Sequence, residues 1–225
     1  MQQLCVIGQR HERSTVNFVG SMSEMGKDNF APHISLDSIK NKKHLYALGP
    51  LGKMQGEITV VDGKPFGVKV NADGDGIVKK NWKIKAPFFV SSNVKSWQTF
   101  EIETAIGSLD ELQKKIEEIA QQNNIDLATP FAFKINGKFD NLTTHVVMPR
   151  SSDVEGYQTD KKQANFELSN QEGELIGFYS QNHGGIYTHK DSRVHVHFIS
   201  SDKTQMGHLD KIMITKKVKV QFPAL

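Results

Sequence analysis

The sequence is short of three features that would each have fixed its class. It has a single cysteine, Cys5, among 225 residues, which excludes an internal disulfide and a sulfur-rich zinc or iron–sulfur site. Its longest apolar runs, such as residues 88–90, fall far short of the roughly 20 residues that cross a bilayer. Its 28 basic and 25 acidic residues leave a net charge of +3, which disfavours a phosphate backbone as partner. Any metal must therefore be bound through nitrogen and oxygen.

The first 20 residues predict no secretory leader. Their apolar piece, residues 4–7, is brief and is soon followed by Arg10, His11, Glu12 and Arg13, whereas a signal peptide needs a longer apolar core. We therefore expect a cytoplasmic protein whose partner is neither a membrane nor a nucleic acid.

What the chain does contain is a series of strand signals. Residues 57–61 and 66–70 flank the turn pair Asp62-Gly63, which predicts a hairpin. Residues 131–147 repeat this pattern around Asn136-Gly137 and predict a second hairpin. Further strands are expected at residues 78–85, 88–94, 174–179, 194–200 and 211–222, and residues 1–45 are left unassigned because they show no sustained period.

One segment has the pattern of an amphipathic helix. Between residues 109 and 122 the apolar side chains recur every three or four positions, and Ser108 with Glu111 forms a capping box at the start. The fold class is therefore α+β, sheet-rich with mixed or antiparallel strands, in two related halves joined by this helix. The expected domains are an N-terminal sheet domain over residues 1–107, the linking helix over 108–129, and a C-terminal sheet domain over 130–225 with the metal site considered next.

The strongest chemical signal is Val194-His195-Val196-His197-Phe198-Ile199, followed by His208. In an extended strand His195 and His197 point to the same side, roughly 7 Å apart between α-carbons, while the valines face the core. His208 follows eleven residues after His197, a spacing that suits a return on a neighbouring strand or loop. Histidines on a half-exposed strand can be ordinary polar surface, but the third histidine and the valine alternation weigh against that interpretation.

Three neutral imidazoles fit Zn²⁺ at about 2.0–2.1 Å and leave a coordination position free, as in catalytic rather than structural sites. Neutral ligands also preserve the charge of the ion for an anionic substrate. His195, His197 and His208 are therefore the candidate metal ligands, and Zn²⁺ is the expected cofactor, although its neighbours among divalent ions stay open. A cupin-like strand would need a glutamate soon after the His-x-His pair, and residues 199–203 contain none.

Several segments together resemble the alpha-acetolactate decarboxylase family. They are Gly173–Phe178, His195–Ser200 and Gly207-His208-Leu209, supported by Leu51–Gly63, which contains Gly56-Glu57-Ile58. The match spans about residues 48–213, and the three-histidine spacing is its specific part. The resemblance implies a two-domain fold that forms a homodimer, with zinc held by the three histidines in the second domain.

The resemblance also implies a carboxy-lyase that converts 2-acetolactate, a small anionic 2-hydroxy-3-oxo acid, to acetoin and CO₂. Loss of CO₂ leaves an enediolate whose negative charge Zn²⁺ can hold as a Lewis acid. Glu57 matches a family glutamate that lies beside the metal and the substrate, where a carboxyl group can exchange a proton. Without the resemblance, a solvated strand carboxylate is the simpler interpretation of Glu57.

The chain departs from the family at two positions. His145 stands where the family has an active-site arginine, and it would bind the substrate carboxylate or donate a proton when protonated. A second family glutamate, in a C-terminal tail, has no counterpart, because Glu174 is the last glutamate of this sequence. Either His183 or His189 takes its task, or the task is lost. Two alternatives follow: a related zinc enzyme acting on another small oxo acid or ester, or a noncatalytic metal-binding homologue.

Overall fold

The computed structural model describes residues 14–25 and 29–224. Strands are labelled β, α-helices α and short 3-10 helices η. In chain order the elements are β1 (Val16–Val19), α1 (Met22–Met25), β2 (Ile34–Ser35), η1 (Leu36–Ser38), β3 (Leu45–Pro50), η2 (Gly52–Met54), β4 (Glu57–Val61), β5 (Lys64–Val70), β6 (Gly76–Lys80), β7 (Lys85–Ala86), β8 (Phe89–Asn93), β9 (Trp97–Ile102), α2 (Leu109–Gln122), β10 (Phe131–Val147), β11 (Gln163–Tyr179), β12 (Val194–Ser200), β13 (Met206–Met213) and β14 (Val218–Pro223).

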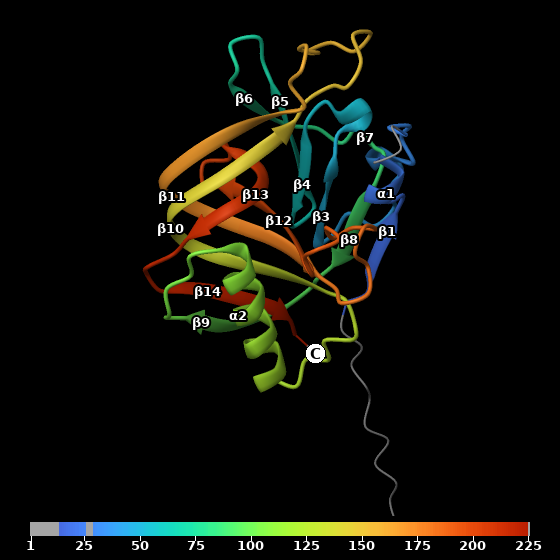
Figure 1. Cartoon of the computed structure of the whole chain (residues 1–225). Coiled ribbons are helices and arrows are strands. Elements are labelled where there is room, and N and C mark those ends of the chain that lie inside the picture. Colours follow the sequence, from blue (N-terminus) through green and yellow to red (C-terminus); the bar gives the residue numbers. More distant parts are fainter. Residues whose placement is uncertain (1–13, 26–28, 225) are drawn as a thin grey trace, which may run out of the picture.

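Two six-stranded antiparallel sheets make up most of the fold (Figure 1). The first has the strand order β1-β8-β3-β4-β5-β6, and the second has the order β11-β12-β13-β10-β14-β9. A separate pair is formed by β2 and β7. The few helices do not alternate with the strands, as they would in a parallel α/β fold. The expected α+β class is confirmed.

The hairpin expected over residues 57–70 is confirmed. Strands β4 and β5 pair antiparallel, and the turn residues Asp62 (φ 46°) and Gly63 (φ 70°) both have positive φ, as a type I′ turn requires. Every residue of β4 is buried. Ile58 and Val60 pack into a core on one side of the first sheet. The period of two then turns Glu57 and Thr59 toward the second sheet.

The prediction of a turn at Asn136-Gly137 is wrong. Strand β10 runs through both residues as one strand of 17 residues and pairs with β11 along its length. Gly137 serves close packing, since a Cβ there would lie 2.6 Å from Cγ1 of Val218 on β14. The single strand expected over residues 211–222 is likewise divided between β13 and β14.

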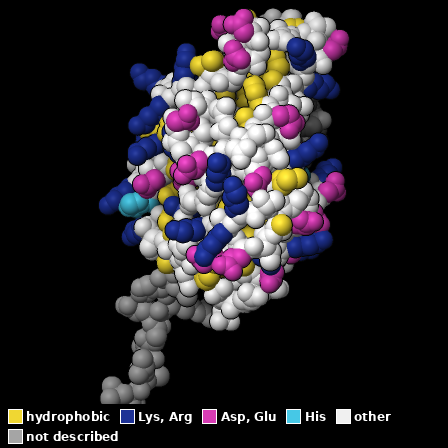
Figure 2. Space-filling model, turned by 90° about the vertical axis from the view of Figure 1, so that its left-hand side faces the viewer, with side chains coloured by type: hydrophobic (Ala, Val, Ile, Leu, Met, Phe, Trp, Pro, Cys, Tyr) yellow, Lys and Arg dark blue, Asp and Glu magenta, His cyan; other side chains and the backbone are white. Residues whose placement is uncertain are grey.

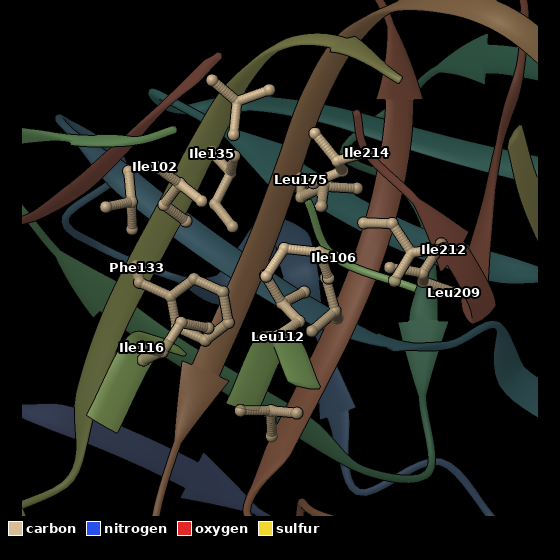
Figure 3. Packing of buried hydrophobic residues seen from close by; sticks show 14 of the residues in the cluster. Ile102, Ile106, Leu112, Ile116, Phe133, Ile135, Leu175, Leu209, Ile212 and Ile214 are labelled. Carbon is tan, nitrogen blue, oxygen red and sulfur yellow. The ribbon is translucent and has the colours of Figure 1, made fainter. Parts of the chain in front are cut away.

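The expected helix is confirmed as α2, and of its capping box one half is present, because Glu111 Oε2 accepts from the backbone N–H of Gly107 rather than from that of Ser108. Ser108 Oγ accepts a hydrogen bond from the backbone N–H of Glu111 at 3.1 Å. The apolar stripe of α2, which includes Leu112 and Ile116, packs against Phe133 and other residues on one face of the second sheet (Figure 3). This core closes that face and leaves the opposite one to meet the first sheet.

The inner faces of the two sheets pack on each other. Tyr46 and Leu48 of β3 share a hydrophobic cluster with Ile176 and Phe178 of β11. Strand β9 precedes the helix in the chain, yet it pairs with β14 in the second sheet. The division into domains at residues 1–107, 108–129 and 130–225 stays a prediction.

The surface carries both signs of charge. On the face shown in Figure 2, Lys and Arg side chains alternate with Asp and Glu side chains rather than gathering by sign. Within residues 14–25 and 29–224, no helix is long and apolar enough to cross a membrane.

Candidate metal centre

The histidines lie on the face of the second sheet that meets the first. All seven residues of β12 are buried. Val196 and Phe198 join the core under α2, so the alternation turns His195 and His197 to the opposite side. Strand β13 pairs with β12 and places His208 directly opposite His197. The structure thus brings the three histidines together.

Their ring nitrogens are close enough to share one ion. The Nε2 atoms of His195 and His197 are 3.2 Å apart, and one nitrogen from each of the three rings lies within 4.8 Å of the others. Two ligands of a tetrahedral Zn²⁺ at 2.0–2.1 Å are about 3.4 Å apart, so the first pair already has the separation of neighbouring ligands. The donor set fits a nitrogen-ligated divalent ion.

The expected protonation state of the three histidines also suits metal binding. Burial lowers the pKa of His195, His197 and His208 well below the usual range, and the neighbouring imidazoles lower it further. The rings are therefore neutral at pH 7 and keep a lone pair for coordination.

Thr59, on β4 of the first sheet, contacts the ring nitrogen of His197 that faces away from the other histidines. Its Oγ1 lies 3.0 Å from Nδ1 of His197, and both side chains are buried. When Nε2 binds a metal, Nδ1 carries the proton and its N–H donates a hydrogen bond to Thr59 Oγ1. Such a partner fixes the tautomer and orientation of a metal-binding histidine.

We expect Thr59→Val to weaken Zn²⁺ binding about 10- to 100-fold, the usual cost of losing the hydrogen-bond partner of a metal-binding histidine. Competition against a chromophoric chelator measures the affinity. Thr188→Val is the matched control, because Thr188 is also fully buried and its hydroxyl has no hydrogen-bond partner within the described part of the chain. Equal affinities for wild type and Thr59→Val would contradict this role of Thr59.

Glu57 points at the same histidines from β4. Its Oε2 is 3.8 Å from Nε2 of His197, and its Oε1 accepts a hydrogen bond from the backbone N–H of Val147 at 3.3 Å. Burial raises the pKa of Glu57 to about 8, although the charge of His145 and the Val147 hydrogen bond oppose the rise. Glu57 can therefore hold a proton near neutral pH.

His145 lies on β10, directly opposite His208. Its Nδ1 is 2.8 Å from both carboxylate oxygens of Asp210, and its Nε2 is 4.0 Å from Oε1 of Glu57. Burial lowers the pKa of His145, but the hydrogen bond to Asp210 and the charges of Glu57 and Asp210 outweigh burial and leave that pKa raised. The imidazolium form of His145 is therefore favoured, and Asp210 balances the charge that this form carries.

The two histidines considered as replacements for the tail glutamate differ in position. His189 reaches the site, with its Nε2 3.3 Å from Nε2 of His208. His183 is turned elsewhere, since its Nδ1 is 2.6 Å from Ser180 Oγ and its ring stacks on Tyr187.

A cavity of about 630 Å³ opens onto these groups. Its polar wall includes Glu57, His145, His189, His195 and His208, and its apolar wall includes methionines from α1 and η2. Arg150 and Lys162, from the connection between β10 and β11, also line it. The cavity can admit a small polar molecule to His195 and His208, whereas His197 is fully buried and does not line it.

The family profile described as Alpha-acetolactate decarboxylase matches residues 19–225. The chain belongs to the alpha-acetolactate decarboxylase family. Among curated proteins, it is 27% identical to the alpha-acetolactate decarboxylase of Brevibacillus brevis over 182 residues, which are 80% of this chain and 60% of that protein. It is also 27% identical to the alpha-acetolactate decarboxylase of Lactococcus lactis subsp. cremoris, over 77% of this chain and 70% of that one.

The fold of this alpha-acetolactate decarboxylase family member agrees with a solved structure. The crystal structure of alpha-acetolactate decarboxylase from Bacillus subtilis strain 168 aligns with a TM-score of 0.74 at 20% identity, covering 93% of this chain and 85% of that one. The likeness shows a shared architecture of the two sheets.

Two side chains of the site escaped the sequence analysis. Thr59 could have been found, because it is two residues from Glu57 on a predicted strand and so shares its face. Asp210 carried a weaker signal. Thr143 pairs with Lys211 and Thr144 with Leu209, so Asp210 is the extra residue of a β-bulge, and a bulge redirects side chains in a way that simple alternation does not predict.

Proposed function

We propose that this protein is a zinc-dependent carboxy-lyase that converts 2-acetolactate to acetoin and CO₂. One observation carries the proposal: in a chain of this family, three buried imidazoles converge, two of them line a cavity, and the Glu57 carboxyl group lies 3.8 Å from the third. The proposed ligands are His195, His197 and His208. When bound there, Zn²⁺ would act as a Lewis acid for the negative charge left by the departing CO₂.

We propose Glu57 as the group that moves a proton. Its carboxyl group faces the proposed ligand His197 and lines the cavity, and a raised pKa lets it hold a proton at neutral pH. A general acid works best when its pKa lies near the working pH. Glu57 would protonate the carbon that CO₂ leaves, while the Val147 N–H keeps its Oε1 in place.

The role proposed for His145 follows from its two contacts. Nδ1–H donates to Asp210, which leaves Nε2 turned toward Glu57. His145 would return a proton to Glu57 between turnovers and orient its carboxyl group. The charge of Asp210 weakens the alternative in which His145 binds the substrate carboxylate.

An acetoin assay tests the proposal. Zn²⁺-loaded protein given racemic 2-acetolactate is expected to form acetoin well above the rate in solution, to fall to that rate with a chelator, and to recover when Zn²⁺ is returned. The expectation rests on the metal as the main site of charge stabilisation. If the metal-loaded protein forms no acetoin above the rate in solution, the proposed activity is refuted.

A related zinc enzyme acting on another small oxo acid or ester is the second candidate. The observation that favours it is the His145–Asp210 pair, which sets this anion site apart from one built on an arginine. Turnover of another substrate that disappears in His197→Ala, with 2-acetolactate inert, would support it.

The remaining expectations complete the proposal. The substrate would be a small anionic acid, the protein would act as a homodimer, and its compartment would be the cytoplasm. The Brevibacillus brevis relative is longer, since this chain spans 60% of it. Sedimentation of the purified protein would measure the oligomeric state.

A further inference from the structure

Besides the proposed metal ion, a cationic side chain that binds the carboxylate of the substrate has to be one of the residues that line the cavity. His145 is one of them, but its Nδ1 lies 2.8 Å from both carboxylate oxygens of Asp210. An aspartate at that distance offsets the attraction of the imidazolium for a second carboxylate. Two other described lining residues, Arg150 and Lys162, are positive at neutral pH.

Arg150 is placed by the same short segment that holds Glu57. It follows the end of β10 by three residues, and Val147, the last residue of β10, donates its N–H to Glu57. The next backbone N–H, from Met148, donates to the carbonyl of Lys162 at 3.0 Å and closes the base of the connection between β10 and β11. Arg150 thus lines the same cavity as Glu57, three residues after the backbone N–H that contacts the Glu57 carboxyl group.

The two cations differ in setting. Arg150 is partly buried, whereas Lys162 is exposed, and solvent and salt screen an exposed charge most strongly. A guanidinium can bind a carboxylate through two parallel hydrogen bonds, which an ammonium cannot.

We propose that Arg150 binds the carboxylate of the substrate and thereby makes this cavity selective for acids over neutral hydroxy ketones, esters and amides. The inference rests on the proposed function for the size and class of the substrate. Arg150 would hold the carboxylate in the cavity that Glu57, His195 and His208 also line.

The test compares two unreactive ligands by calorimetry: 2-hydroxy-2-methylbutanoate, which lacks the 3-oxo group needed for decarboxylation, and its uncharged primary amide. Wild-type protein loaded with Zn²⁺ is expected to prefer the carboxylate. Arg150→Gln is expected to reduce that preference about 10- to 100-fold, the usual range for a hydrogen bond to a charged group, and to leave amide binding unchanged. Lys162→Gln, with the same loss of charge at the same cavity, is the matched control and should lose much less.

Arg150→Lys completes the design. It keeps the charge, so it should retain part of the carboxylate preference, and it serves as the main variant if Arg150→Gln folds poorly. Three results would each overturn the proposal. The first is an unchanged carboxylate preference in both Arg150 variants, and the second is an equal loss of that preference in Arg150→Gln and Lys162→Gln. The third is no carboxylate preference in the wild-type protein. Neither ligand reacts, so the binding test does not depend on acetoin formation. The role of Arg150 can therefore be confirmed in a protein that forms no acetoin, and it can be refuted in one that does.

Discussion

His197→Ala is expected to lower acetoin formation about a thousandfold or more, because a metal ion contributes several kcal/mol of transition-state stabilisation and 1.4 kcal/mol corresponds to a factor of ten. His197 is fully buried, and its ring lies next to two other imidazoles. It also contacts the side chains of Thr59 and Glu57. Its loss would remove a proposed ligand and leave Thr59 without its partner. Metal analysis and the acetoin assay measure the two effects on the same sample.

His44→Asn is a suitable control for this variant. His44 pairs with Asp62 at the first hairpin, away from the cavity, and asparagine tolerates the left-handed backbone there (φ 55°). Thermal unfolding should accompany both variants, since removal of a buried ring also leaves a hole in the core. A folded His197→Ala protein with full zinc content and full activity would refute the proposed ligand set.

Glu57→Gln is expected to lower kcat about 10²- to 10⁴-fold, the contribution of a positioned general acid or base. Glutamine has nearly the same shape as glutamate and can keep the hydrogen bond from the Val147 N–H, but it cannot release and regain a proton. Zinc content should therefore stay close to that of wild type. The separation of metal binding from turnover is what distinguishes Glu57→Gln from His197→Ala.

Glu103→Gln provides the matched control. Glu103 is an exposed carboxylate that faces Lys217 at the second sheet, so the same chemical change there should leave turnover intact. Single-turnover measurements would show whether the chemical step itself has slowed. If Glu57→Gln retained wild-type kcat with zinc in place, another group would have to supply the proton.

Local patterns predicted the elements whose structure depends on their own residues. Asp62-Gly63 turns because both residues adopt positive φ, and α2 begins after Ser108 because the hydroxyl of Ser108 accepts a hydrogen bond from the backbone N–H three residues further on. The convergence of His195 and His197 follows from the period of a strand. These parts of the fold and of the candidate site could be predicted from the sequence because each depends on a few neighbouring positions.

The parts that could not be predicted depend on contacts between distant residues. Asn136-Gly137 has the local signal of a turn, yet Gly137 is needed for the approach of Val218. The pairing of His145 with Asp210 depends on a bulge in the ladder between β10 and β13. Arg150 approaches the cavity because the connection after β10 folds back on its own base. Such placements depend on strand register, which a single sequence does not reveal.

The hydrogen bond between Thr59 and His197 joins residues that are 138 positions apart. Contacts with so large a sequence separation require an extended loop to close, and chains dominated by them fold slowly. The imidazole trio can gather on one sheet, but its supporting threonine and carboxyl group arrive only when the other sheet docks. The site is therefore complete only when the two sheets have packed on each other, and the same step buries the hydrophobic cluster between them.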